Sequence, residues 1–413
     1  METKHVQFTE EMRKTHTILI PDMLPIHFKL ITAVLGRYGY KTELLQNSAR
    51  AVVDEGLKNV HNDTCYPALL VIGQFLDALK SGKYDPDKVA LMISQTGGGC
   101  RASNYLHLLR KALEAEYPQI PVISLNFSGL EKSPGFKLTL PLLLKLVDAV
   151  LYGDLMMMLY NQCKPYEVNE GDTDAALAAT ELALAKKAAG RGFGSKRKNY
   201  KLILDAFAAV RRKNQEKPRV GIVGEIYVKY SPLANNHLEE FLIREGCEPV
   251  VPGLMDFVLY CAVNNVNDGR IYGFKNTMTR VSSLLYKYLL SLNRKLGKAV
   301  DKYGCFRSMD DFEELRKEAD KLINQGVKMG EGWLITAEMG CLAKTGTLNI
   351  VCTQPFGCLP NHIVAKGMSR RVKDEYPDAN IVAIDYDPSA TSVNQENRLK
   401  LMLANIREKP EHK

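Results

Sequence analysis

Short apolar segments alternate with amphipathic segments of about 12 to 15 residues along the chain, a pattern typical of parallel sheets covered by helices. In the first half, this alternation predicts strands and intervening helices at residues 17–20, 25–37, 42–45, 66–79, 89–94, 102–115 and 121–125. Consecutive parallel strands need a crossover connection, so these elements predict one mostly parallel sheet with helices on both faces. Ligands of such sheets bind at the loops after the carboxyl ends of the strands.

The same alternation resumes at Pro218, after a helix-rich segment at 141–213. The predicted strands of the second half are 219–225, 248–251, 257–260, 348–352 and 380–385, and its predicted helices include 237–245, most of 273–327 and 393–406. We therefore expect an α/β protein with two doubly wound, Rossmann-like domains. The expected divisions are a polar N-terminal arm (1–14), a first domain (15–165), a helical connector (166–217) and a second domain (218–413).

The length of the chain bears on the number of domains, and its net charge bears on the kind of partner. A chain of 413 residues exceeds what one hydrophobic core usually organises, which also favours two domains. Much of the net charge of +8 lies in the segment 186–213, which we interpret as a solvated helical face rather than a nucleic-acid site. Attraction to an anionic, phosphate-bearing substrate or to an acidic partner protein is the intermediate interpretation.

The apolar stretches of the chain do not indicate a membrane protein. No apolar leader follows the polar N-terminal residues, and charged residues interrupt the longest apolar stretches, near 140–159 and 285–292. We therefore expect a cytoplasmic protein that does not bind a membrane. Nine cysteines in such a chain argue for thiols used in packing, metal binding or catalysis, and against a disulfide framework.

Three of the nine cysteines lie in loops rich in glycine or proline. Cys65 lies in Asn-Asp-Thr-Cys-Tyr-Pro, Cys100 in Gly-Gly-Gly-Cys-Arg and Cys358 in Pro-Phe-Gly-Cys-Leu-Pro. Glycine and proline allow backbone to approach a bound group closely, whereas a cysteine that only fills space belongs on an apolar face of a helix or strand. These three cysteines are therefore the candidate metal ligands.

The spacing of these cysteines excludes a zinc ribbon and an ordinary ferredoxin, because no Cys-x-x-Cys pair occurs. Ligands this far apart in the chain imply a site that the fold assembles in a cleft between two domains. Three thiolates can hold a cubane iron–sulfur cluster and leave one iron open to a substrate. The alternative is that all three are packed thiols in tight turns.

The remaining cysteines are weaker candidates. Cys352, at the end of a predicted strand, is either an additional ligand or a buried strand residue. The others lack a comparable loop context and are expected to be structural: Cys163, Cys247, Cys261, Cys305 and Cys341.

Candidates for acid–base chemistry rest on position alone. They are Glu225, Glu338 and His362. His362 follows Cys358 by four residues, so it is a candidate to tune a cluster or donate a proton, and it could equally cap the next helix. The Gly-Ile-Val-Gly segment at 221–224 lacks the third glycine of a dinucleotide fingerprint, and no Walker-type phosphate loop occurs. ATP hydrolysis is therefore not expected in this chain.

At these residues the chain resembles the 2-hydroxyacyl-CoA dehydratase family. More closely, it resembles the dehydratase-like C-terminal part of very large proteins that are fused to activator ATPase modules. The patches that carry the resemblance are residues 62–68, 96–105, 221–230, 330–338, 354–363 and 385–398. The resemblance extends over nearly the whole chain from about residue 15.

The resemblance implies two Rossmann-like domains around an oxygen-sensitive [4Fe-4S] cluster held by Cys65, Cys100 and Cys358. It also implies a separate ATP-hydrolysing iron–sulfur activator protein, which donates a low-potential electron. The implied reaction removes water from a 2-hydroxyacyl-CoA through a ketyl radical. A homologous dehydratase-like subunit or a second copy of the chain is the further partner implied.

The chain departs from the family pattern at the third ligand. Cys358 is followed by Leu-Pro, where dehydratases usually have Asp-Pro, and Cys352 lies just upstream. Relatives that hold a double-cubane iron–sulfur cluster reduce small molecules and need not dehydrate anything. Three functions therefore remain open: a 2-hydroxyacyl-CoA dehydratase, an ATP-dependent reductase of small molecules, and a non-catalytic electron-relay or scaffold subunit.

Overall fold

The computed structural model describes residues 5–61, 63–95, 99–125, 133–274, 277–389 and 392–408. Asn62 and residues 96–98, which belong to the loops of Cys65 and Cys100, lie outside the described residues.

The first sheet contains four parallel strands in the order β2-β1-β3-β4. The strands are β1 (Thr17–Pro21), β2 (Lys41–Leu45), β3 (Val89–Ser94) and β4 (Val122–Leu125). Its accompanying helices are α1 (Met12–Thr15), α2 (Pro25–Arg37), α3 (Arg50–Asn59), α4 (Tyr66–Lys80), the 3₁₀ turns Pro86–Lys88 and Arg101–Asn104, and α5 (Tyr105–Leu113).

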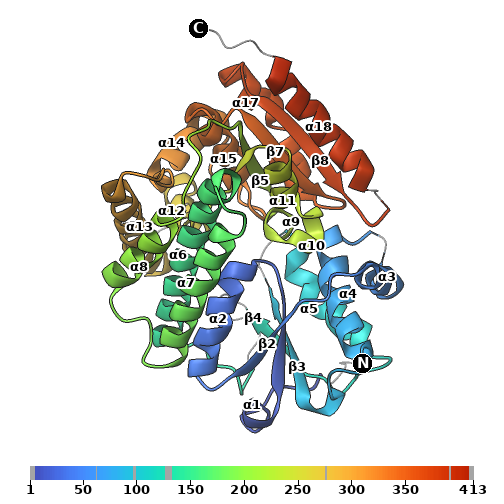
Figure 1. Cartoon of the computed structure of the whole chain (residues 1–413). Helices are drawn as coiled ribbons and strands as arrows, with labels where there is room; N and C mark the ends of the chain where they lie inside the picture. Colours follow the sequence, from blue (N-terminus) through green and yellow to red (C-terminus); the bar gives the residue numbers. More distant parts are fainter. Residues whose placement is uncertain are drawn as a thin grey trace.

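The second sheet repeats this topology in the order β6-β5-β7-β8, again with all strands parallel. Its strands are β5 (Arg219–Gly224), β6 (Glu248–Val250), β7 (Asn349–Pro355) and β8 (Asn380–Tyr386). In Figure 1 it lies above the first sheet, with α9 (Ile226–Tyr230) and α10 (Pro232–Asn235) between the two. The predicted α/β class with parallel sheets is thus confirmed, and the arrangement is consistent with two Rossmann-like domains.

The remaining secondary-structure elements of the described chain are helical. After the first sheet come α6 (Leu140–Cys163), the 3₁₀ turn Lys164–Tyr166, α7 (Asp172–Ala189) and α8 (Lys196–Ala208). Around the second sheet lie α11 (Leu238–Arg244), α12 (Leu254–Ile271), α13 (Thr277–Tyr303), α14 (Phe312–Leu322), α15 (Trp333–Lys344), α16 (Leu359–Asn361), the π-helical segment His362–Lys366, α17 (Ser369–Glu375) and α18 (Ser392–Glu408). The predicted boundaries at 165/166 and 217/218 stay predictions.

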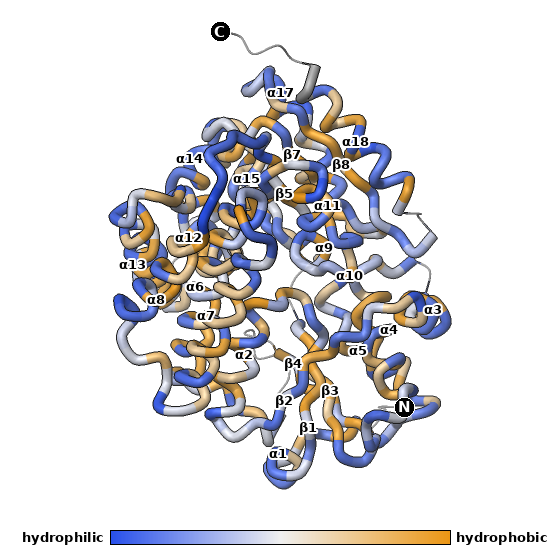
Figure 2. Tube along the Cα trace, viewed as in Figure 1, coloured by the Kyte–Doolittle hydropathy of each residue, from blue (hydrophilic) through white to orange (hydrophobic). Residues whose placement is uncertain are grey.

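Alternate strand residues face different hydrophobic cores because side chains of a strand point to opposite faces. Ile18 and Ile20 of β1 face a core shared with the helices α2 and α6–α8, whereas Leu19 faces the core built on α4 and α5. The strand interiors are hydrophobic, as Figure 2 shows for β1, β3 and β4. Both faces of each sheet are therefore buried, as expected for parallel sheets.

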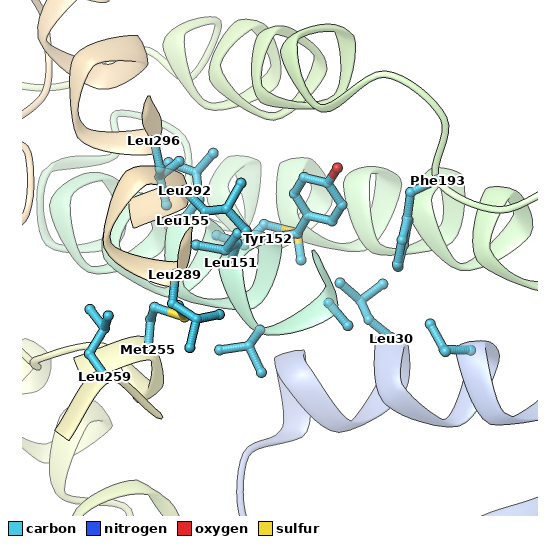
Figure 3. Close-up of a cluster of buried hydrophobic side chains, with 14 of the residues drawn as sticks. Leu30, Leu151, Tyr152, Leu155, Phe193, Met255, Leu259, Leu289, Leu292 and Leu296 are labelled. Carbon is cyan, nitrogen blue, oxygen red and sulfur yellow. The ribbon is translucent and has the colours of Figure 1, made fainter. Parts of the chain in front are cut away.

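The long helices join one continuous core that extends from the first sheet to the second half of the chain. Leu151 and Leu155 of α6 pack in the same cluster as Leu259 of α12 and Leu292 of α13 (Figure 3). The helix-rich segment predicted at 141–213 therefore contributes apolar side chains to the core, and α6 contacts α2, α7, α8, α12 and α13 in this layer.

One predicted strand is wrong. Residues 257–260 belong to the helix α12, whose buried residues Met255, Leu259, Ala262 and Val263 recur at helical spacing. The four residues 257–260 are too few to show a helical period, which becomes visible only when the flanking residues are included. The structure also contains α3, which was not predicted; it packs closely on α4, since a β-carbon on Gly73 would lie 2.0 Å from the Val52 carbonyl oxygen.

The N-terminal segment expected as a polar arm contacts the body of the protein. Phe8 is buried in the main core, and its carbonyl oxygen accepts a hydrogen bond from the Gly135 N–H at 2.8 Å. Within the part of the chain that the structure describes, none of the helices combines the length and the apolar character needed to traverse a lipid bilayer.

A buried carboxylate connects three helices from distant parts of the chain. Asp154 of α6 accepts hydrogen bonds from the N–H groups of Leu254 and Met255 at the start of α12, at 2.7 and 2.8 Å. It also contacts Nε2 of the fully buried His27 on α2 at 2.8 Å. These bonds satisfy otherwise unpaired groups at the N-terminus of α12, and they tie the first sheet's helices to the second half.

We expect Asp154→Ala to lower the free energy of unfolding by about 3–5 kcal/mol, because it leaves His27 and the first N–H groups of α12 buried without a partner. Urea denaturation of the purified chain measures the change. The matched control is Asp301→Ala, at an exposed position on α13, for which a change within about 0.5 kcal/mol is expected. Equal losses in the two variants would contradict this role of Asp154.

Candidate functional site

Both sheets have a topological switch point, where consecutive crossovers leave in opposite directions. In the order β2-β1-β3-β4 this point lies between β1 and β3, and in the order β6-β5-β7-β8 it lies between β5 and β7. Ligands of open α/β sheets bind beyond the strand ends at such points. Cys100 follows β3, Glu225 follows β5 and Cys358 follows β7, so three predicted site residues lie at the two switch points.

The loops of Cys65 and Cys358 are in direct backbone contact. The Tyr66 N–H donates a hydrogen bond to the Phe356 carbonyl oxygen at 2.9 Å. Gly357 has a φ of +74°, and a β-carbon there would lie 3.0 Å from the Cα of Cys65. Only glycine combines this left-handed conformation with the close approach, so the glycine before Cys358 is what lets the two loops meet.

Cys100 lies near the Cys358 loop, with Gly330 between them. A β-carbon on Gly330 would lie 4.0 Å from the Cys100 sulfur and 3.4 Å from Cβ of Pro360, so Cys100 and the Cys358 loop lie on either side of this glycine. Thiolate charge on Cys100 raises the pKa of Cys358, and thiolate charge on Cys65 raises that of Cys100. The structure therefore brings together the three cysteines singled out from the sequence.

The three cysteines share a local geometry. Each is the residue that immediately precedes a helical turn: Cys65 before α4, Cys100 before the 3₁₀ turn Arg101–Asn104, and Cys358 before α16. Burial raises the pKa of all three thiols, that of Cys100 to about 11. A backbone N–H of the following turn opposes this and lowers each pKa; these N–H groups belong to Ala68, Ala102 and Asn361.

Tyr105, the first residue of α5, lies against the first of these thiols. Its hydroxyl is 2.9 Å from the Cys65 sulfur, and its ring is buried. The hydrogen bond lowers the pKa of Cys65 against the larger effect of burial, and the Arg101 charge acts in the same direction. Tyr105 and Arg101 thus join the Ala68 N–H in favouring a thiolate at Cys65.

Two buried carboxyl groups lie at the first turn of α9, Glu225 directly after β5 and Glu331 from the segment before α15. The Glu225 carboxylate accepts the Val228 N–H at 2.9 Å, and the Glu331 carboxylate accepts the Ile226 N–H at 3.1 Å, so both bind the first turn of α9. Burial, followed by the charge of Glu331, raises the pKa of Glu225 to about 8. Burial also raises the pKa of Glu331, so this pair retains a proton near neutral pH.

Glu338 is paired with a cation. Lys229 donates to its two carboxylate oxygens at 3.0 and 3.3 Å, and both residues are buried. The Lys229 ammonium also lies 4.7 Å from the centre of the Tyr230 ring. Burial still raises the pKa of Glu338, and Lys229 opposes the shift. A carboxylate held in this way is a structural partner of Lys229 rather than a free acid or base.

The structure separates Cys352 from the group of three. Cys352 lies inside β7 in the core formed by Val223, Met339 and Ile350, whereas its neighbour Val351 faces the core that contains Cys65. Strand alternation therefore turns Cys352 to the face covered by α15. Its sulfur is 3.8 Å from Oδ1 of Asn361.

His362 is exposed at the start of the π-helical segment. Its Nδ1 lies 3.0 Å from the Cys358 carbonyl oxygen, and the side-chain nitrogen of Gln354 lies 2.9 Å from the ring. This contact stabilises the backbone of the Cys358 loop, and both roles considered for His362 in the sequence stay predictions.

The other five cysteines lie elsewhere. Cys163, Cys247 and Cys341 are buried within the fold, and Cys163 donates to the Phe207 carbonyl at 3.7 Å. Cys261 and Cys305 are exposed. A surface pocket of about 660 Å³ between α12, α14 and α17 involves none of the predicted site residues; it is lined by Arg270, Ile271, Asp320, Lys321, Leu322, Ile323, Asn324, Gln325 and Arg371.

The chemistry of the three thiols is compatible with an iron–sulfur cluster, because thiolates are the usual ligands of such clusters. Each thiol is followed by a helical turn whose N–H lowers the thiol pKa, which favours the thiolate form that a cluster needs. Among the described residues, no group of three or more His, Cys, Asp or Glu side chains could hold a metal ion.

Comparison of the sequence with models of known protein families gives no match, and comparison with curated proteins gives none either.

Sequence reasoning missed Glu331, Tyr105 and Asp22. Glu331 and Tyr105 lie within the patches that carry the family resemblance, but neither has a motif of its own. Asp22 directly follows β1, so the rule that sites form beyond strand ends was sufficient to find it. One of its carboxylate oxygens is buried without a hydrogen-bond partner, and burial raises the pKa of Asp22 to about 7, against the charge of Lys29.

The raised pKa of Asp22 predicts a pH-dependent stability. The unfolded chain loses this proton near the ordinary aspartate pKa of 3.8 and the folded chain near 7, so stability falls as pH rises between these values and then levels off. Asp22→Asn removes the effect, so its stability relative to the native chain should increase by about 2–4 kcal/mol from pH 4 to pH 8. Urea denaturation at the two pH values measures this. A constant difference between the two proteins would show that Asp22 ionises as in water.

Proposed function

We propose that this chain is the cluster-binding component of an enzyme that dehydrates a 2-hydroxyacyl-CoA after receiving an electron from a separate ATP-hydrolysing iron–sulfur activator. The observation that carries the proposal is the convergence of Cys65, Cys100 and Cys358 beyond the strand ends of the two sheets. In the proposal these thiols, as thiolates, hold a [4Fe-4S] cluster. When bound, such a cluster supplies single-electron chemistry at low potential to a thioester carbonyl.

The chain's own acid groups supply the proton that a departing hydroxyl group needs. Glu225 and Glu331 are buried, lie close enough to influence the pKa of both Cys100 and Cys358, and retain a proton between them. Glu338 does not share this role, because Lys229 compensates its charge. We therefore assign proton donation to the Glu225–Glu331 pair.

Three partly exposed apolar side chains lie on the loops of the proposed site. Met329, which packs against Gly99, is 47% exposed, and Phe356 and Leu359, on either side of the Cys358 turn, are 53% and 62% exposed. Leu359 occupies the position where dehydratases usually have aspartate. An apolar residue there lowers the local polarity, which strengthens electrostatic interactions inside the site.

The second candidate, a reductase with a double-cubane cluster, is favoured by this departure at Leu359. A larger cluster needs additional thiolates, however, and Cys352 lies in a different core from Cys65. The single cubane therefore accounts better for the thiols that the fold assembles.

We expect about four iron atoms and four sulfides per chain after anaerobic reconstitution, with an electron paramagnetic resonance signal on reduction. Cys65→Ser, Cys100→Ser and Cys358→Ser should each remove most of the iron, because each deletes one of three ligands. Cys163→Ser and Cys352→Ser are the matched buried controls and should retain it. About eight irons per chain would favour the double cubane, and greater loss in Cys163→Ser than in Cys100→Ser would contradict the ligand assignment.

Glu225→Gln should leave the iron content unchanged and lower turnover about 100-fold or more, because it removes a proton donor while glutamine can still accept the Val228 N–H. Turnover is measured with 2-hydroxyacyl-CoA thioesters in the presence of the activator protein and ATP. The control is Glu240→Gln, which changes an exposed carboxylate on α11. Loss of iron in Glu225→Gln would show that this residue supports the metal site instead of donating a proton.

A further inference from the structure

Tyr105 extends from the segment of one candidate ligand to the sulfur of another. It is the first residue of α5 and directly follows the 3₁₀ turn Arg101–Asn104, which begins after Cys100. Its hydroxyl lies 2.9 Å from the Cys65 sulfur, although Cys65 is forty residues earlier in the chain. A single side chain therefore links the loops of Cys65 and Cys100.

Hydrophobic packing holds the ring of Tyr105 in place. The ring is buried in the core cluster that also contains Leu109 of α5 and Leu69 of α4. Side chains in a closely packed core have little freedom to leave their rotamers, so the hydroxyl cannot readily turn to another group. The packing of α4 against α5 therefore fixes the hydroxyl beside the Cys65 sulfur.

The hydroxyl is the donor of this contact once Cys65 is a thiolate. A phenol is a weaker acid than a thiol, with an ordinary pKa of about 10 against about 8.5, so the proton stays on the oxygen when the sulfur loses its own. Within the part of the chain that the structure describes, the Cys65 sulfur is also the one hydrogen-bond partner of this hydroxyl. The Tyr105 O–H therefore donates to the thiolate.

A hydrogen bond to a ligating sulfur alters the reduction potential of an iron–sulfur cluster. The donor withdraws electron density from the thiolate, which stabilises the reduced, more negative form and raises the potential. Negative charge near a cluster acts in the opposite direction, and the buried pair Glu225 and Glu331 places such charge near Cys100 and Cys358. The Tyr105 hydroxyl opposes the effect of this acidic pair.

We propose that Tyr105 is a positioning residue of the cluster site, whose hydroxyl donates to the Cys65 sulfur and raises the reduction potential of the group that the three cysteines hold. It thereby makes the site easier to reduce for a protein that donates an electron. The inference rests on the cluster of the proposed function, because Tyr105 acts through Cys65. It does not depend on the substrate or on dehydration, since the potential is a property of the cluster site alone.

Tyr105→Phe keeps the ring and removes the hydroxyl. We expect the iron and sulfide content after anaerobic reconstitution to equal that of the native chain, and the reduction potential to be lower. Loss of one hydrogen bond to a charged group should decrease the equilibrium constant for one-electron reduction about tenfold, which corresponds to ~59 mV. A redox titration followed by electron paramagnetic resonance measures the potential.

Tyr200→Phe is the matched control. Tyr200 of α8 is buried, as Tyr105 is, and its hydroxyl has no hydrogen-bond partner among the described residues. Its ring packs in a different hydrophobic core from that of Cys65. Deletion of this hydroxyl should therefore leave both the iron content and the reduction potential unchanged.

A second measurement keeps the native sequence. Growth on a ring-fluorinated tyrosine replaces each tyrosine by a more acidic phenol, which is a stronger hydrogen-bond donor. The reduction potential should then rise in the native sequence and stay unchanged in Tyr105→Phe grown in the same way. The fluorinated native protein gives a result even if Tyr105→Phe folds poorly, which far-UV circular dichroism would reveal.

The possible failures are distinguishable. Full iron content with an unchanged potential in Tyr105→Phe would reduce Tyr105 to a packing residue and overturn this inference alone, as would an equal shift in Tyr200→Phe. Loss of iron from Tyr105→Phe as severe as from Cys65→Ser would show that Tyr105 is needed to assemble the site instead of setting its potential. A native chain that binds no iron would refute the proposed cluster, and this inference with it.

Discussion

The contact between the Cys65 and Cys358 loops is the interaction on which the candidate site depends. It joins the loop after β7 to the start of α4. One backbone hydrogen bond forms there, and Gly357, which has no β-carbon, packs against the backbone of Cys65. Cys100 and the Cys358 loop then meet across Gly330. At Gly357 backbone approaches backbone, and glycine makes this possible because a β-carbon would crowd the Cα of Cys65. At Gly330 the neighbours are side-chain atoms at ordinary contact distance, and the left-handed φ of +61° is what favours glycine.

The electrostatics of the site follow from that convergence. Burial of three thiols beside the acidic pair Glu225 and Glu331 raises the pKa of the thiols, so the metal-free site favours their protonated form. A bound cationic cluster would displace those protons and restore the balance of charge. The N–H groups of the following helical turns, together with Tyr105 at Cys65, already favour a thiolate there.

Local patterns accounted for most elements because strands and helices differ in the period of their apolar residues. The helix predicted at 25–37 is α2, and the strand predicted at 89–94 is β3. The strand predicted at 257–260 failed because a short apolar run has no period of its own, and only the packing of Met255 and Leu259 reveals the helix. Burial on both faces of β7 likewise made Cys352 indistinguishable from a ligand in the sequence.

The sequence by itself determined the class of fold and the three loops that carry the candidate ligands, because glycine, proline and apolar periodicity act locally. Tertiary structure alone decided that the loops of Cys65, Cys100 and Cys358 meet. It also decided that Lys229 pairs with Glu338 and that Glu331 lies beside Glu225. These outcomes depend on how two sheets and their helices pack together, and packing between distant segments leaves no periodic trace in the chain.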